Sequence, residues 1–132
     1  MSATAYPFAV LRDVSVSKND FIARIGPGIH DKHALMREVG AKLQFPSYFK
    51  GNSWDAFSDW LRDLSWIGNS RILLLHEGTP HLPRKELLTY LSIAFYAIES
   101  HAEEKRALVV AFPEQTRALL DAWSGYKPYN CP

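Results

Sequence analysis

The sequence has little of what would tie it to an oxidising compartment or to a membrane. It contains a single cysteine, Cys131, next to its last residue, so an intrachain disulfide framework is excluded. Its apolar runs are short, and the stretch from Ile72 to Leu75 is far below the length that spans a bilayer. The first residues lack a basic region followed by a long apolar run, so we expect no signal peptide and a cytoplasmic location.

An excess of charge of one sign is also missing. The 15 Lys and Arg residues nearly balance the 14 Asp and Glu residues, and the net charge is +1. This balance excludes a whole-chain field that would favour nucleic acid or an anionic membrane. A length of 132 residues suits one domain over residues 1–132, which is large enough to bury a core without disulfides or metal ions.

The usual signatures of catalysis and cofactor binding are absent as well. There is no glycine-rich phosphate loop, no nucleophile elbow and no metal-binding cysteine pair. The chain has five histidines: His30, His33, His76, His81 and His101. Histidines at such spacing are more often exposed or buried in a core than bound to zinc. We expect no catalytic residue, metal or cofactor; a hydrolase that uses a histidine with a carboxylate is the enzymatic alternative.

The apolar segments that are present predict an α/β fold. Continuous apolar runs, rather than alternating patterns, indicate buried strands of a parallel sheet that is covered on both faces. The predicted strands are Asp20 to Ile25, Arg71 to His76 and Ala107 to Phe112. The predicted helices are Asp31 to about Pro46, Ser53 to Ser65 and Arg84 to Glu103. This order predicts a small parallel sheet of about three strands, packed with helices through right-handed crossovers.

The segments that flank this core, which spans about residues 20–112, are expected to be N- and C-terminal extensions. Residues 8–16 are apolar enough to form an extra edge strand. Pro113 and Glu114 are expected to start a short last helix that continues through Trp123. The remaining tail, from Gly125 to Pro132, is expected to be irregular.

The helix predicted from Ser53 to Ser65 is the most informative element for function. Ser53 is a good N-cap residue, and the apolar side chains that follow form one stripe. These are Trp54, Phe57, Leu61 and Leu64. The opposite side carries charged residues, namely Asp55, Asp59, Arg62 and Asp63. A row of carboxylates beside an aromatic turn indicates a protein-binding surface, although charged helix faces are more often only solvated.

The segment from Phe45 to Trp66 resembles the barstar family, the small intracellular inhibitors of secreted ribonucleases such as barnase. The resemblance rests on an aromatic residue before proline, two further aromatics, a glycine, the triplet Trp-Asp-Ala, a later aspartate and a downstream tryptophan. The order of elements over roughly residues 20–112 is also similar. The resemblance therefore implies a barstar-like fold and a protein partner, a secreted ribonuclease or another toxin, with no direct binding to nucleic acid or membrane.

The resemblance also implies which residues contact the partner. Tyr48, Phe49 and Gly51 match the aromatic pair and the glycine of the family's binding turn. Asp55 matches the first helix aspartate, and Asp59 matches the central aspartate, which in the family enters the ribonuclease active site in place of a substrate phosphate.

Two further positions complete the predicted binding surface, and four positions depart from the family pattern. Glu99 aligns with an acidic residue of the later helix that adds a second contact, and Arg62 stands where the family has a small polar contact. Lys50 is an extra residue in the turn. Ser53 replaces an asparagine and Ser58 replaces a tryptophan. These differences leave the target open, so a barstar-like interaction or regulatory module with a partner other than a nuclease is the alternative to an inhibitor.

Overall fold

The computed structural model describes residues 7–116 as a four-stranded parallel sheet with three α-helices. The strand order is β1-β4-β3-β2. The strands are β1 (Ala9–Val10), β2 (Phe21–Ile25), β3 (Arg71–His76) and β4 (Ala107–Phe112). The helices are α1 (Lys32–Lys42), α2 (Trp54–Asp63) and α3 (Arg84–Glu103), with short 3-10 helices at η1 (Leu11–Asp13) and η2 (Glu114–Thr116).

The three predicted core strands are confirmed, and a fourth strand is added by the N-terminal segment. β3, β4 and α3 have the predicted bounds, and β2 begins one residue after the predicted start. The apolar segment 8–16 contributes only the two residues of β1, because the chain turns into η1 directly afterwards. Of the predicted last helix, η2 is described; its continuation through Trp123, the tail and Cys131 lie outside the described residues.

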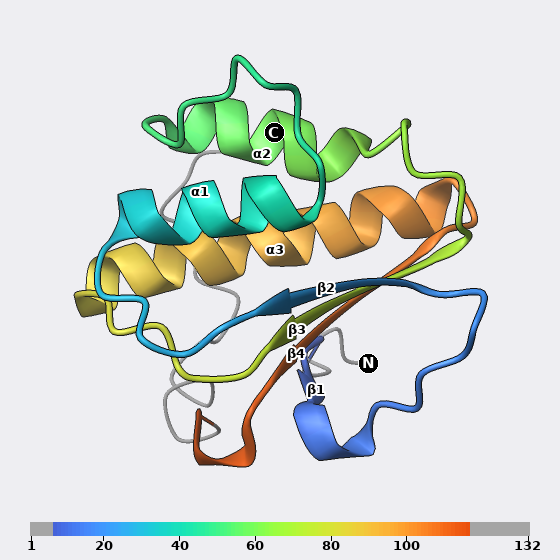
Figure 1. The fold of residues 1–132 in the computed structure, drawn as a ribbon, viewed down its shortest axis with the longest axis horizontal. Coiled ribbons are helices and arrows are strands. Elements are labelled where there is room, and N and C mark those ends of the chain that lie inside the picture. The colour runs from blue at the N-terminus through green and yellow to red at the C-terminus, as the bar shows by residue number, and fades with distance from the viewer. Residues whose placement is uncertain (1–6, 117–132) are drawn as a thin grey trace.

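The three helices lie on one side of the sheet (Figure 1). α1 and α3 lie next to the sheet, and α2 lies farther from it. α1 packs on β2 and α3 packs on β4, whereas α2 packs on α3. Large side chains from both layers share this core, including Tyr90, Phe57, Phe112, Leu35 and Leu74, which are almost fully buried. α2 is therefore the helix farthest from the sheet. Its outer side faces away from the core and carries the exposed residues Asp55, Asp59 and Asp63.

The opposite face of the sheet buries a smaller apolar cluster. Leu73, Leu75 and Ala111 form its centre, and Leu11 and Val14 from the segment between β1 and β2 pack against it. Alternate residues of β3 and β4 therefore point to two different apolar environments. Because both faces of the sheet are covered, both strands have continuous apolar sequences. The sequence analysis inferred such a sheet from these sequences.

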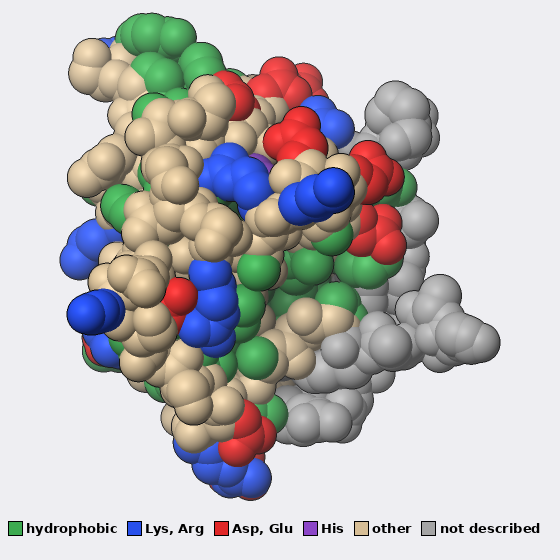
Figure 2. All heavy atoms as spheres, turned by 90° about the vertical axis from the view of Figure 1, so that its right-hand side faces the viewer, with side chains coloured by type: hydrophobic (Ala, Val, Ile, Leu, Met, Phe, Trp, Pro, Cys, Tyr) green, Lys and Arg blue, Asp and Glu red, His purple; other side chains and the backbone are tan. Residues whose placement is uncertain are grey.

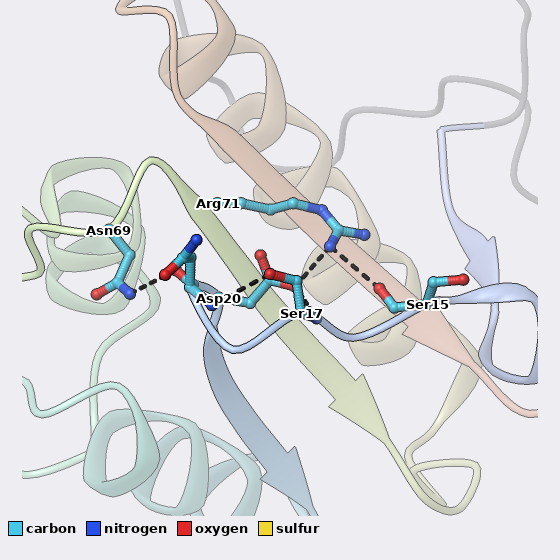
Figure 3. Close-up of polar contacts among 6 residues, drawn as sticks. Ser15, Ser17, Asp20, Asn69 and Arg71 are labelled. Atoms are coloured by element: carbon cyan, nitrogen blue, oxygen red, sulfur yellow. Dashed lines mark hydrogen bonds and ion pairs between the residues drawn. The ribbon is translucent and has the colours of Figure 1, made fainter.

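A partly buried ion pair attaches the segment between β1 and β2 to the start of β3 (Figure 3). Arg71 Nη1 lies 2.6 Å from Asp20 Oδ2 and 3.1 Å from the carbonyl oxygen of Ser15. Asp20 Oδ2 also accepts a hydrogen bond from the Ser17 amide at 2.8 Å, and its side chain is only 5% exposed. Asn69 adds a hydrogen bond to the Asn19 carbonyl.

None of the helices within residues 7–116 has both the length and the apolar character that a membrane span requires.

Candidate protein-binding surface

The ends of α2 place its charged residues on the outside of the molecule. The Ser53 side chain accepts a hydrogen bond from the Ala56 amide at 3.2 Å and caps the first turn, as predicted. The helix ends at Asp63, two residues before the predicted end, because Leu64 adopts a left-handed conformation with φ 47°. The turn buries the Leu64 side chain completely. The exposed carboxylates are those of Asp55, Asp59 and Asp63.

Gly51 holds the turn before α2 against α1. Its backbone has φ +73°, and a Cβ atom placed there would lie 2.5 Å from Arg37 Cγ. The Gly51 carbonyl lies 2.9 Å from His33 Nδ1. The glycine of the motif is thus required both for its backbone conformation and for close contact between the turn and α1.

The two aromatic residues of the turn have different surroundings. Phe49 is half-buried, and its ring packs edge-to-face on Phe45 with centroids 5.2 Å apart. Tyr48 is 68% exposed, and its ring packs on Trp60 at 5.8 Å. Trp60 in turn packs on Trp66 at 5.9 Å. Phe49 therefore anchors the turn, while Tyr48 is presented to solvent on an aromatic support.

Asp59 lies exposed on the outer side of α2, next to Arg62. Its side chain is 71% exposed, and Oδ1 accepts a hydrogen bond from Arg62 Nη2 at 3.1 Å. The Arg62 side chain is 36% exposed, and its Nε is buried without a hydrogen-bond partner among the described residues. The basic residue at this position thus lies directly against the predicted central aspartate.

Asp59 and Asp63 form a ridge between two hollows on the surface. The first hollow, of about 460 Å³, lies beside the turn and is lined in part by Tyr48, Lys50 and Trp60. The second, of about 400 Å³, lies between α2 and α3 and is polar. It is lined by Asp59, Arg62, Asp63, Ser65, Ser100, Glu104 and Arg106. A bound protein could therefore contact Asp59 from either side.

The carboxyl end of α2 is fixed by two residues that the sequence analysis did not identify. Buried His101, on α3, lies with Nε2 2.9 Å from the carbonyl oxygen of Leu61, and burial lowers the pKa of its imidazole. Arg106 donates hydrogen bonds to the carbonyl oxygens of Asp63 and Ile67. Cationic and N–H groups are favourable here because the last carbonyls of a helix lack intrahelical partners.

Glu99 is exposed on α3, but it lines neither of the two hollows beside Asp59. Trp60 and Asp63 also line the first hollow. Asp63 was predicted on the charged side of the helix, but the resemblance assigned neither residue a contact. Ser58, the other departure in α2, is fully buried, and its hydroxyl has no hydrogen-bond partner within residues 7–116.

Figure 2 shows the end of the molecule where α2 and α3 terminate. Hydrophobic side chains gather at its top, over the turn that precedes α2, and acidic and basic side chains lie interspersed below them. The surface is therefore mixed in charge rather than uniformly acidic. An exposed aromatic group surrounded by charged residues is typical of a protein-binding site.

Three histidines of the described segment, His30, His76 and His81, have well-defined contacts. His76 is buried, with Nδ1 2.9 Å from the Ala111 carbonyl oxygen and Nε2 2.6 Å from the Tyr90 hydroxyl. Burial lowers the pKa of His76 to about 4. His30 and His81 stack on each other at 5.3 Å. Within residues 7–116, no three His, Cys, Asp or Glu side chains are grouped so that they could hold a metal ion.

The fold and surface together define a small parallel α/β domain with exposed carboxylates on the outer side of α2 and an exposed aromatic turn beside them. The chain belongs to the barstar family: the family model described as Barstar (barnase inhibitor) matches residues 20–113. Proteins of this family are inhibitors and not enzymes. None of the curated proteins and none of the solved structures matches the chain significantly.

Proposed function

We propose that this protein is an intracellular inhibitor or immunity protein that binds and blocks a ribonuclease through the outer side of α2 and the Tyr48 turn. Membership of the barstar family supports a barnase-like ribonuclease as the target class. The observation that carries the proposal is the exposed Asp59 carboxylate, which lines the same hollow as Tyr48.

A carboxylate in this position suits the chemistry of a ribonuclease active site. Ribonucleases bind substrate phosphate through arginine, lysine and histidine side chains, and these donors also bind a carboxylate through charge-assisted hydrogen bonds. Asp59 would take the place of the phosphate, and its desolvation within the complex would make it a hot spot. Asp55, Glu99 and the turn residues Phe49 and Gly51 would surround or support this contact.

Arg62 and Lys50 make this surface less acidic than a surface of carboxylates alone, which would best complement a strongly basic nuclease. With a net charge of +1, the chain has little long-range attraction for a cation-rich target. Association should then depend on contacts at the interface more than on electrostatic steering.

The proposal can be tested by titrating the purified protein into an RNA-cleavage assay with barnase as the probe nuclease. We expect stoichiometric loss of cleavage and, in cells that co-express the two proteins, protection from the nuclease. Asp59→Ala should lose most of the inhibition, whereas Asp13→Ala, which removes an exposed carboxylate of η1, should retain it. If the wild-type protein neither inhibits nor protects, barnase-type inhibition is overturned and an interaction module with another partner is favoured.

A further inference from the structure

Arg62 is folded back along α2 rather than extended into solvent. Its Nη2 donates a hydrogen bond to Asp59 Oδ1 at 3.1 Å, three residues earlier on the helix. Only 36% of the Arg62 side chain is exposed, against 71% of that of Asp59, and the Arg62 Nε is buried. In the free protein, the guanidinium therefore already binds the carboxylate that is proposed to enter the active site of the target.

The buried part of Arg62 is incompletely hydrogen-bonded. Its Nε has no hydrogen-bond partner within residues 7–116, and the same is true of the Ser58 hydroxyl. Ser58 is fully buried and lies one turn earlier on α2, so the two side chains share one face of the helix. A buried donor without an acceptor is unfavourable. The Arg62 side chain would therefore gain a hydrogen bond if a bound protein offered it a new acceptor.

The other arginine at this end of α2 has a different role. Arg106 donates hydrogen bonds to the carbonyl oxygens of Asp63 and Ile67, so its contacts hold the end of the helix. Arg62 and Arg106 both line the polar hollow between α2 and α3. Of these two, only Arg62 forms an ion pair with a carboxylate among the described residues. Arg62 is thus the arginine that competes directly for Asp59.

We propose that Arg62 is a specificity-determining residue, which weakens binding to targets that offer Asp59 only cationic groups. The inference rests on the proposed function, because it takes a ribonuclease cleft as the opposing surface. Such a cleft must displace the Arg62 guanidinium to reach Asp59, and it then faces a like charge within the interface. A target that presents a carboxylate or carbonyl oxygen beside its cationic groups gives the displaced guanidinium an acceptor, and so avoids this penalty.

Calorimetric titration of the full-length protein with barnase measures this effect. Arg62→Gln should lower Kd at least about fivefold at low ionic strength, and the gain should shrink as salt screens the charge. Arg62→Lys keeps the charge and should stay within about twofold of the wild type.

Arg12→Gln is the matched control for the loss of one positive charge. Arg12 is also an exposed arginine with a carboxylate partner, Asp13. It lies in η1, whose Leu11 packs on the opposite face of the sheet from the helices. Because this charge is remote from α2, Arg12→Gln should leave Kd within about twofold of the wild-type value.

An equal or higher Kd for Arg62→Gln than for the wild type would overturn the proposal, as would an equal gain in Arg62→Lys or Arg12→Gln. If the wild type binds barnase and Arg62→Gln binds it no better, the inhibitor remains and the role of Arg62 is rejected. If Arg62→Gln binds barnase and the wild type does not, Arg62 is the discriminating residue and barnase is excluded as a target of the wild type. If neither protein binds barnase, both the barnase-type target and the role of Arg62 are rejected.

Discussion

At the scale of single residues, the position of Tyr48 depends on Gly51 three residues later. The positive φ of Gly51 and the closeness of Arg37 leave no room for a side chain. The glycine therefore links the conformation of the turn to the surface of α1, and through it sets where the exposed tyrosine lies.

Gly51→Ala should lower the free energy of unfolding by about 2 kcal/mol, because a left-handed residue with a Cβ atom is strained and also meets Arg37. Gly68→Ala is the control, since Gly68 is exposed and has open space around its Cα; a change within about 0.5 kcal/mol is expected there. Chemical denaturation measures both values. Equal stability of the two variants would show that the turn adapts to a side chain at Gly51.

The sequence indicated the residues of the motif but not how they are used. Tyr48 and Asp59 are exposed and adjacent to the same hollow, which the resemblance implied for binding residues. The inward packing of Phe49 and the contact between Arg62 and Asp59 could not be deduced from spacing. Both depend on side-chain rotamers, which the surrounding packing determines.

At the scale of elements, the sequence predicted correctly those strands and helices that begin and end at local signals, such as the ends of an apolar run or a proline. β3 and β4 are continuous apolar runs, and α3 begins directly after Pro83, which acts as its N-cap residue. The end of α2 was predicted less well, because the left-handed Leu64 and the partners His101 and Arg106 are set by contacts between distant segments. Contacts between segments so far apart in the sequence cannot be predicted from local sequence patterns.

The segment between β1 and β2 gives a prediction at this scale. Asp20→Asn removes the charge that pairs with Arg71 and leaves a partly buried guanidinium without its counterion. We expect a loss of about 2 kcal/mol in the free energy of unfolding, less than for a fully buried pair because Arg71 is partly exposed.

Hydrogen exchange can localise that effect. In Asp20→Asn, faster exchange is expected for the amides of residues 14–20, while the amides of α2 keep their wild-type protection. Asp31→Asn, which keeps a capping oxygen at the exposed start of α1, is the control. Unchanged stability and exchange in Asp20→Asn would mean that the ion pair does not hold the segment.

At the scale of the whole molecule, the sheet, α3 and α2 are connected through a buried aromatic group. His76 stacks on Phe112 with centroids 4.1 Å apart and contacts the Tyr90 hydroxyl. Tyr90 packs on Phe57 and Trp54 of α2. Burial raises the pKa of Tyr90, so its hydroxyl stays protonated. The helix layer that carries the proposed binding surface therefore packs, through Tyr90, on a histidine that burial keeps neutral.

This arrangement predicts that acid destabilises the protein. Burial lowers the pKa of His76 from 6.5 to about 4, so the unfolded chain binds a proton that the folded chain excludes. Stability should be highest above pH 6.5 and fall as the pH decreases toward 4, by about 3 kcal/mol from this residue. His101, whose pKa is also lowered, adds to the loss in the same direction.

Urea denaturation at several pH values, together with an NMR titration of His76, measures this dependence. His81→Asn, which removes an exposed histidine, should leave the slope of stability against pH unchanged. A flat stability profile between pH 6.5 and 4, or a His76 pKa near 6.5, would contradict the prediction.

The most direct test of the binding surface is the affinity of the protein for barnase, measured by isothermal titration calorimetry for the wild type, Asp59→Ala and Asp13→Ala. We expect Asp59→Ala to raise Kd by at least roughly thirtyfold, equivalent to about 2 kcal/mol, and Asp13→Ala to change it little. Thermal unfolding should show that both variants remain folded, since both side chains are exposed. Equal affinity of Asp59→Ala and the wild type would contradict the assignment of the α2 surface as the inhibitory site.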